Sequence, residues 1–397
     1  MRILFLSPFV PYPENSGSKM RAMSLLRSLK DHEVILLAFK DKRERIHDKE
    51  LKKYCSELYV FQRPVITAIQ RFINHFSFKP LLSKRFYTSE AQMKLKEILK
   101  DKEIKIVVAE TLLMAEYIRS QKNIYNVLDE HNLEFVRASR RIKGCKSWAK
   151  KIYFYLIMMR LKKYELKTLT NFDRCLVCSK VDKKNLEKFF PDKNVNVIPN
   201  TVDTHYFSYI QKAPDSKKII FTGTMWYEPN VDAVRYFSRE ILPLLKTDFP
   251  DVEFDIVGDR PTEDVLSLSA EKGVSITGYV DDIKPFLSKA SVFVAPIRMG
   301  SGTRLKILSA MSMGIPVVAT EVGCEGIEVT DGENILIAEN PYQFREKIMK
   351  LFKDRNFRNH ISKKGRTLVE RKYSHEVVER ELISLWEEIK SEVGRDA

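Results

Sequence analysis

The feature that most constrains the fold is a series of short apolar segments, separated by longer segments of helical character such as Ser18 to Lys30. Strands that are apolar throughout, rather than alternating, are typical of a parallel sheet covered by helices on both faces. The first half of the chain is therefore predicted to be a Rossmann-like α/β unit. Its expected strands are Ile3 to Ser7, Glu33 to Ala38, Ile104 to Ala109, Asn126 to Asp129 and Arg174 to Cys178.

The same pattern restarts after a polar segment, Ser208 to Lys217, which is expected to be an interdomain linker. Two facing Rossmann-like domains, 1–207 and 208–374, are predicted, with a ligand cleft at the carboxyl ends of both sheets. The apolar positions of a last helix, His375 to Glu392, form one stripe, so residues 375–397 are expected to pack back on the N-terminal domain. The second set of expected strands is Lys218 to Thr222, Glu253 to Val257, Ser275 to Thr277, Ser291 to Ala295, Pro316 to Ala319 and Ile335 to Ile337.

Charge is distributed unevenly along the 397 residues. Residues 1–200 hold 41 Lys and Arg against 22 Asp and Glu, whereas residues 201–397 hold 27 against 31, within a net charge of +15. A basic N-terminal half suggests an anionic partner, which could be a membrane surface, a phosphate-linked acceptor or nucleic acid. A generally basic surface without a specific partner is the alternative, and the sequence contains no recognisable nucleic-acid-reading module.

The N-terminal apolar run is interrupted by Pro8 and is expected to be a buried strand rather than a signal peptide. The longest later apolar run, Ile152 to Met159, is far shorter than the roughly 20 residues that span a bilayer. Five cysteines suggest reduced thiols in a cytoplasmic protein, and the Cys175 and Cys178 pair is interpreted as structural because it lies in an apolar strand. We expect a cytoplasmic protein, with peripheral binding to the inner face of the membrane as a further option.

The most informative segment runs from Ala295 to Thr320. It leaves a strand, passes Gly300 and Gly302, and enters a helix whose first turn is expected to contain Thr303, Arg304 and Lys306. Glycines allow a phosphate close to the backbone, and a helix start offers free N–H groups and a positive dipole end. These features predict a diphosphate site, with an ordinary strand-to-helix turn as the alternative.

Several further motifs occur in order along the chain. They are Ser7 to Pro13 with Gly17, Asp129 to Glu134, Cys178-Ser179, Ile198 to Asp203, Phe221 to Met225 with Pro229-Asn230, Val257-Gly258, Thr277 to Val280 and Gly300 to Ala319. With these motifs the chain resembles the family 4 glycosyltransferases of the GT-B superfamily, in particular bacterial polysaccharide-associated sugar transferases. The resemblance implies retaining transfer of a sugar from a UDP- or GDP-linked donor to a saccharide or lipid-linked acceptor, without a required metal or cofactor.

The resemblance and the residue chemistry together assign expected roles. The expected catalytic residues are His131, Arg304 and Lys306. An imidazole can donate a hydrogen bond to a sugar hydroxyl or polarise the reacting oxygen, and cations stabilise a leaving diphosphate. The expected acceptor-side residues are Asn15, Ser16 and Glu110, and the alternatives are a helix-entry turn and a structural carboxylate. The alternative for Tyr279 and Val280 is strand-end packing, and the alternative for Gly223 is a plain tight turn. The expected donor-binding residues are Gly17, Gly223, Tyr279, Val280, Gly300, Ser301, Gly302, Thr303 and Ser309.

The chain also departs from the family pattern. Met225 to Asn230 stands where relatives often carry a basic pair, and Ser301 and Ser309 stand where they carry glutamates. Ser309 replaces the carboxylate expected to hold the ribose hydroxyls, so nucleotide affinity is expected to fall unless another group substitutes. A non-catalytic binding or regulatory subunit therefore stays open, as does an epimerase or phosphorylase on the same fold.

A basic, aromatic run from Lys143 to Lys167 is expected to be a helix. Its lysines and aromatic side chains, among them Trp148, Tyr153 and Tyr155, suit the surface of an anionic membrane. Ordinary domain packing is the alternative.

Overall fold

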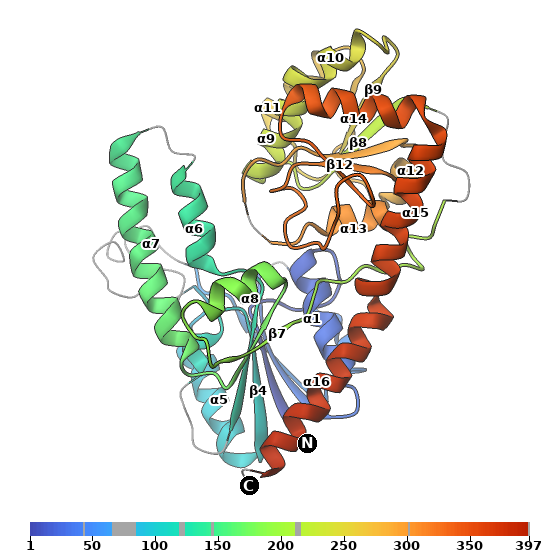
Figure 1. Ribbon diagram of the computed structural model, residues 1–397. Coiled ribbons are helices and arrows are strands. Elements are labelled where there is room, and N and C mark those ends of the chain that lie inside the picture. Colours follow the sequence, from blue (N-terminus) through green and yellow to red (C-terminus); the bar gives the residue numbers. More distant parts are fainter. Residues whose placement is uncertain are drawn as a thin grey trace. The chain divides into compact units, whose positions relative to one another are not determined.

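The computed structural model describes residues 1–42, 44–65, 85–118, 124–143, 147–210, 216–300 and 302–395. The chain forms two compact units, one made of Met1–Asn200 with Val378–Ala397 and the other of Thr201–Val377. Each contains a single parallel sheet, as predicted (Figure 1).

The first unit contains a seven-stranded sheet in the order β3-β2-β1-β4-β5-β6-β7. The order reverses between β1 and β4, the place where Rossmann-like sheets bind ligands beyond the carboxyl ends of their strands. The strands are β1 (Arg2–Ser7), β2 (Glu33–Lys40), β3 (Glu57–Gln62), β4 (Ile104–Glu110), β5 (Tyr125–Glu130), β6 (Arg174–Val177) and β7 (Asn194–Val197).

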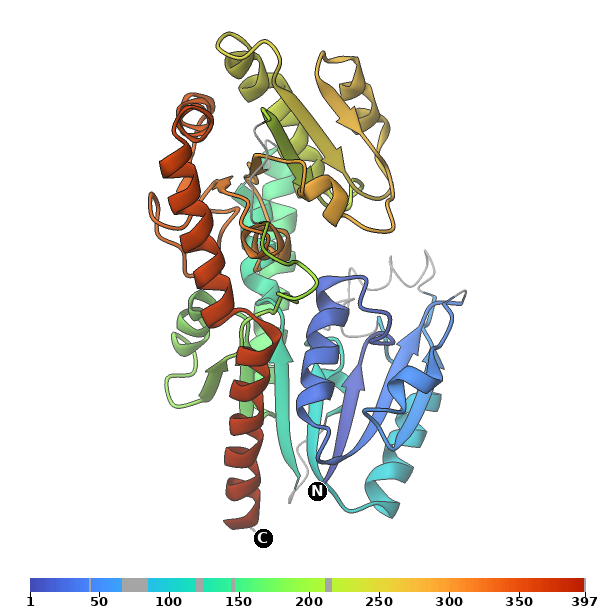
Figure 2. The same ribbon diagram turned by 90° about the vertical axis from the view of Figure 1, so that its right-hand side faces the viewer.

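Helices cover both faces of this sheet, and the alternation of side chains along each strand separates the two cores. Ile3 and Phe5 of β1 face α1 (Gly17–Ser28), α2 (Asp48–Leu51) and α16 (His375–Arg395). Leu4 and Leu6 face the core that includes α5 (Ser89–Asp101) and parts of α6 (Glu134–Lys143), α7 (Trp148–Leu169) and α8 (Lys180–Glu187). Figures 1 and 2 show α1 and α16 together on one face of the sheet and α5 on the other.

Helix α16 is part of the first core from Val378 onward. Its buried side chains Val378, Leu382, Leu385, Trp386 and Ile389 recur at helical spacing and contribute to the core beneath α1. The indole of Trp386 donates to the hydroxyl of Ser28 in α1 at 2.8 Å. The polar group of this large side chain is therefore satisfied inside the core.

The second unit contains a six-stranded parallel sheet in the order β10-β9-β8-β11-β12-β13, with its reversal between β8 and β11. One continuous core packs against the sheet. The strands are β8 (Lys218–Thr222), β9 (Glu253–Val257), β10 (Val274–Ile276), β11 (Val292–Ala295), β12 (Val317–Ala319) and β13 (Leu336–Ile337). The helices are α9 (Glu228–Tyr236), α10 (Leu242–Lys246), α11 (Glu263–Leu266), α12 (Lys284–Leu287), α13 (Leu305–Ser312), α14 (Pro341–Lys353) and α15 (Arg355–Lys372).

The observed boundaries differ from the expected ones. The first unit ends at Asn200 rather than 207, because the following segment belongs to the second core: Val202 donates its N–H to Tyr373 at 2.8 Å, and Phe207 is buried. The middle of the expected linker, residues 211–215, lies outside the described residues. Strands β3 and β7, at the two edges of the first sheet, were not predicted. Of the helices in the described part of the chain, none combines the length and apolarity needed to cross a bilayer.

Candidate functional site

A buried ion pair fixes the residues at the end of β5 in the first unit. Arg21 of α1 donates to both carboxylate oxygens of Asp129, with its Nε 2.8 Å from Oδ2 and its Nη2 2.5 Å from Oδ1. The two side chains are 3% and 0% exposed. Arg21 also donates to the Ile198 carbonyl at 2.7 Å and to Asn200 at 3.2 Å. A buried charge pair with its donors and acceptors satisfied holds its surroundings in one geometry.

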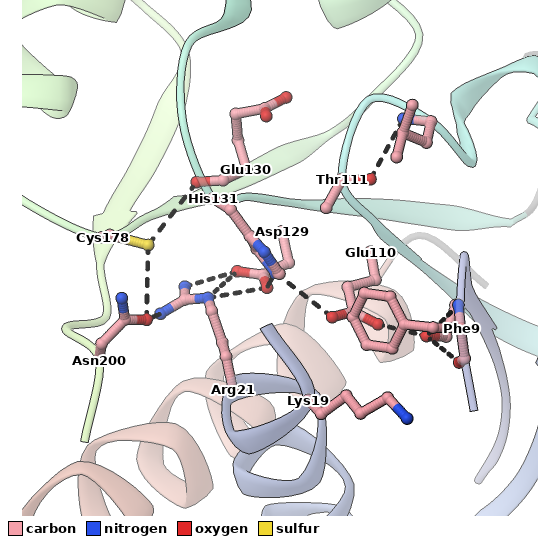
Figure 3. Close-up of polar contacts among 12 residues, drawn as sticks. Phe9, Lys19, Arg21, Glu110, Thr111, Asp129, Glu130, His131, Cys178 and Asn200 are labelled. Atoms are coloured by element: carbon pink, nitrogen blue, oxygen red, sulfur yellow. Dashed lines mark hydrogen bonds and ion pairs between the residues drawn. The ribbon is translucent and has the colours of Figure 1, made fainter. Parts of the chain in front are cut away.

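His131 follows β5 directly and lies against two carboxylates (Figure 3). Its Nε2 is 3.1 Å from Asp129 Oδ2 and 3.4 Å from Glu110 Oε1. Burial alone would lower the pKa of His131, but the hydrogen bonds and negative charges of Asp129 and Glu110 raise it to about 9. Burial alone would raise the pKa of Asp129, but Arg21 and His131 lower it to about 2. His131 is therefore an imidazolium at neutral pH.

Glu110 lies at the end of β4, where an acceptor-side residue was expected. Its side chain is completely buried, accepts a hydrogen bond from the Ser7 hydroxyl at 2.5 Å and contacts His131. Burial raises the pKa of Glu110. The structure therefore places Glu110 behind His131 as a group that orients the ring, rather than on an exposed surface.

The other expected residues of the first unit form the start of α1. Ser16 is the N-cap, and its hydroxyl accepts from the Lys19 N–H at 3.4 Å. Asn15 and Ser16 are exposed, and Gly17 is half-buried as the first helical residue. The helix-entry interpretation accounts for their local geometry, and their exposure leaves them accessible to a ligand.

The second unit contains the glycine-rich segment between β11 and α13. Gly300 and Gly302 have φ of 101° and 87°, a region that favours glycine. Ser301 lies outside the described residues. Helix α13 begins at Leu305, not at Thr303 as expected, because Gly302 is left-handed and Arg304 is still extended, with φ −87° and ψ 93°. Lys306 is in the first turn, whereas Thr303 and Arg304 precede the helix.

Thr303 and Arg304 present polar groups at this helix start. The Thr303 hydroxyl is buried without a hydrogen-bond partner among the described residues. Arg304 folds back over the glycine segment, and its Nη1 donates to the Gly302 carbonyl at 2.9 Å. A buried hydroxyl without a partner is unfavourable unless a ligand supplies one. These groups and the N–H groups of the first turn suit an oxyanion.

Lys306 extends from α13 toward the end of β8. Its Nζ donates to Asn230 Oδ1 at 2.8 Å and lies 4.0 Å from the centre of the Phe221 ring. Removal from water, and then the charge of Arg304, lower the pKa of Lys306 well below its ordinary value. Lys306 is thus a desolvated basic group beside a second one, Arg304, and no carboxylate is among the causes of its pKa shift. An anion would be stabilised at this place.

Gly223 directly follows β8 and lies beside Lys306. A Cβ on Gly223 would lie 2.5 Å from Lys306 Nζ and 2.8 Å from Asn230 Nδ2. The end of β9 packs on the same turn, since a Cβ on Gly258 would lie 1.7 Å from the Gly223 carbonyl oxygen. The backbone approaches neighbouring protein groups closely here, so both positions require glycine, and the approach of a donor phosphate to Gly223 stays a prediction.

Three further expected donor residues occupy different environments. Tyr279 follows β10 and is 71% exposed, so its ring is available for stacking. Val280 is half-buried and packs on the core. Ser309 is 7% exposed on α13, three residues after Lys306 and so on the same helix face.

Sequence reasoning missed two residues of these sites and one unusual residue elsewhere in the second unit. Arg21, which is paired with Asp129, is one of many basic residues, and nothing marked it as buried. Asn230 was noted only as part of a motif, yet it holds Lys306. Arg260, with a positive φ of 49°, stacks at 5.2 Å over Trp226, which lies in the segment where the basic pair of relatives is absent. The unusual backbone of Arg260 cannot be read from sequence.

The fold and the two residue clusters define an α/β protein of two Rossmann-like units, one with a candidate oxyanion site at a helix start. Two family models cover most of the chain: Glycosyltransferase Family 4 matches residues 17–206, and Glycosyl transferases group 1 matches residues 216–354. The chain belongs to the GT-B glycosyltransferase superfamily. The resemblance stated from the motifs is therefore confirmed.

The chain is also similar to individual proteins, two of them in sequence and one in fold. The chain is 24% identical over 372 residues to a protein from the cps region of Klebsiella pneumoniae, covering 89% of this chain and 91% of the relative. It is 31% identical over 145 residues to the capsular polysaccharide biosynthesis glycosyltransferase CapM of Staphylococcus aureus, covering 34% of this chain and 38% of CapM. Its fold is similar to that of Anabaena HepE in complex with UDP and glucose, with a TM-score of 0.67 and 12% identity over 98% of this chain and 99% of HepE.

Proposed function

We propose that this glycosyltransferase transfers a sugar, with retention of its anomeric configuration, from a nucleoside diphosphate to a saccharide hydroxyl during polysaccharide synthesis. The observation that carries the proposal is the convergence of Thr303, Arg304 and Lys306 on the start of α13. CapM, which carries capsule synthesis in its name, and the HepE complex with UDP and glucose support the substrate classes. The comparisons favour transfer over an epimerase or a non-catalytic subunit.

The second unit would stabilise the leaving diphosphate. Negative charge grows on the diphosphate as the glycosidic bond breaks, and fixed cations and N–H groups in a site with little water stabilise it strongly. Arg304 is charged at all relevant pH values. The pKa of Lys306 is lowered in the free protein, and the arriving diphosphate would raise it again, because an adjacent anion favours the charged ammonium group.

The first unit would contribute His131. Its Nε2 faces Asp129 and Glu110, so Nδ1–H is the donor left for a substrate oxygen. With a pKa of about 9 the imidazolium serves as a hydrogen-bond donor at neutral pH, not as a base. Asp129 and Glu110 position the ring. No step of this proposal is assigned to a metal ion or a cofactor.

Helix α7 favours a membrane surface as the place of action. Trp148, Ile152, Tyr155, Leu156 and Met159 are 45–76% exposed and lie on one face of the helix. Lysines are interspersed, which suits an interfacial helix on anionic lipid. Vesicle co-sedimentation would compare the wild type, the double variant Trp148→Ser/Leu156→Ser and the control Leu266→Ser, which changes an exposed leucine of the second unit. The double variant should bind anionic vesicles less than the wild type, and the control should bind them equally well. Equal binding of all three proteins would contradict this role.

A screen of UDP- and GDP-linked sugars against oligosaccharide and lipid-phosphate acceptors tests the proposed reaction. Formation of an elongated product with the donor's anomeric configuration, read by NMR, is the expected result. Epimerised donor, sugar phosphate as the product, or nucleotide binding with no turnover would each contradict the proposal.

A further inference from the structure

A pocket of about 230 Å³ lies within the first unit. It is lined by the segments that follow β1 and β4, by the start of α1, and by the end of β5 with the first turn of α6. This is the carboxyl edge of the sheet, at the reversal of strand order between β1 and β4. His131 is part of the lining. The pocket therefore adjoins the residue proposed to serve the transferred sugar.

Arginines gather around the pocket. Arg85 and Arg137 line it, and Arg63 lies behind Phe86, a lining residue that is 5% exposed. The guanidinium carbons of Arg63 and Arg85 are 5.0 Å and 5.8 Å from the centre of the Phe86 ring. Burial, and then the charges of Arg63 and Arg137, lower the pKa of Arg85. Arg63 and Arg137 are thus close enough to repel the charge of Arg85, and an anion between them would relieve the repulsion.

The carboxylates nearby balance only part of this charge, although Glu134 lines the pocket as well. Arg137 pairs with Glu134 at 3.2 Å, and Arg63 pairs with Asp41 at 3.3 Å. Arg85 forms no ion pair with a carboxylate among the residues that the structure describes. The arginine that lines the pocket without a carboxylate partner is therefore available for an incoming anion.

Glu130 gives the pocket a buried polar wall. Its side chain is 2% exposed, and its Oε2 has no hydrogen-bond partner within the described ranges. Figure 3 shows this side chain pointing away from the contact between Asp129 and Arg21. Burial, and then the charge of Glu165, raise the pKa of Glu130 well above its usual range. A raised pKa means that burial disfavours the charged form of this carboxyl group, so it opposes an anion less than a carboxylate of ordinary pKa would.

We propose that this pocket binds an oxyanion, a phosphate or carboxylate carried by the acceptor sugar, through Arg85 and Arg137. The inference rests on the proposed transfer reaction, since it assigns the chemical class of that reaction's acceptor. The pocket is smaller than the roughly 300–1,000 Å³ of sites for drug-sized ligands. It therefore suits one charged sugar unit rather than an extended chain, and Arg85 and Arg137 are the specificity-determining residues.

Binding of small probes to the full chain, without donor, tests the inference directly. Glucose 1-phosphate, glucuronate and glucose would be titrated by NMR against wild type, Arg85→Gln/Arg137→Gln and the control Arg235→Gln. Arg235 is a half-buried arginine of the second unit, paired with Asp264 at 2.9 Å. At least one anionic probe should bind ten-fold or more tighter than glucose, and the double variant should lose about 10- to 100-fold of that affinity. The two anionic arms distinguish phosphate from carboxylate.

Equal binding of glucose and both anions, or unchanged affinity in the double variant, would overturn the inference. Both substituted arginines are exposed, and a thermal melt checks that the double variant folds. Competition of inorganic phosphate with the bound probe on wild type provides a second readout that needs no variant. Hydrolysis of the donor in the absence of acceptor separates the two claims: hydrolysis with no anion preference leaves the proposed reaction standing and rejects the pocket.

Discussion

Replacing Lys306 by methionine should lower the transfer rate by on the order of 10²–10³-fold, about 2.7–4 kcal/mol of transition-state stabilisation. Methionine keeps an unbranched apolar side chain and removes the charge, together with its hydrogen bond to Asn230 and its contact with the Phe221 ring. An Arg304 guanidinium alone would then face the departing diphosphate. Steady-state kinetics with saturating acceptor, together with titration of the free nucleoside diphosphate, would measure the effect.

The same substitution should change stability little. Leaving Asn230 Oδ1 without its donor costs about 1–3 kcal/mol, and removal of a desolvated cation beside Arg304 offsets part of this. Lys246→Met is a matched control, because burial also lowers the pKa of Lys246, which lies in α10 near Gly273 at the amino end of β10. An unchanged rate in Lys306→Met, or an equal loss in Lys246→Met, would refute the reasoning.

The remaining predictions concern His131 and three positions in the second unit. Because its pKa is raised in the folded protein, His131 contributes on the order of 3 kcal/mol to the free energy of unfolding below pH 6.5, and this contribution is lost as pH rises through about 9. Denaturant unfolding measured against pH should show the loss, and the pH dependence should disappear in His131→Gln. Gly223→Ala should abolish nucleotide binding in calorimetry, and intact binding would contradict the close approach at this position. Gly278→Ala is the comparison: a Cβ there meets nothing within 4 Å, so the change should cost only about 1 kcal/mol of stability. Ser309→Glu should tighten nucleoside diphosphate binding by roughly ten-fold or more, through a carboxylate offered to the ribose; weaker binding by a folded variant would reject that role.

Strands with continuous apolar runs were predictable from sequence, whereas the edges of the first sheet were not. Strand β3 is half-buried along most of its length, and β7 reads Asn-Val-Asn-Val, so neither shows the fully apolar pattern that identified the central strands. Edge strands are covered less completely and carry mixed residues. The sequence therefore indicates a doubly wound sheet but not its full width.

Site residues divide in a similar way. Gly223, Gly300, Gly302 and Lys306 were predictable because a strand, glycines and a helix follow one another in sequence. The partners of His131 were not predictable as a group, because Arg21 and Asp129 are 108 residues apart and only the fold brings them together. Likewise, the start of α13 was placed two residues early, since the extended backbone of Arg304 follows from local geometry.

A crystal structure with a bound nucleoside diphosphate would test the central claim most directly. We predict that the phosphates contact the N–H groups at the start of α13, the Thr303 hydroxyl, and the side chains of Arg304 and Lys306. A nucleotide bound elsewhere, with the Thr303 hydroxyl and Lys306 in their present environment, would contradict the account.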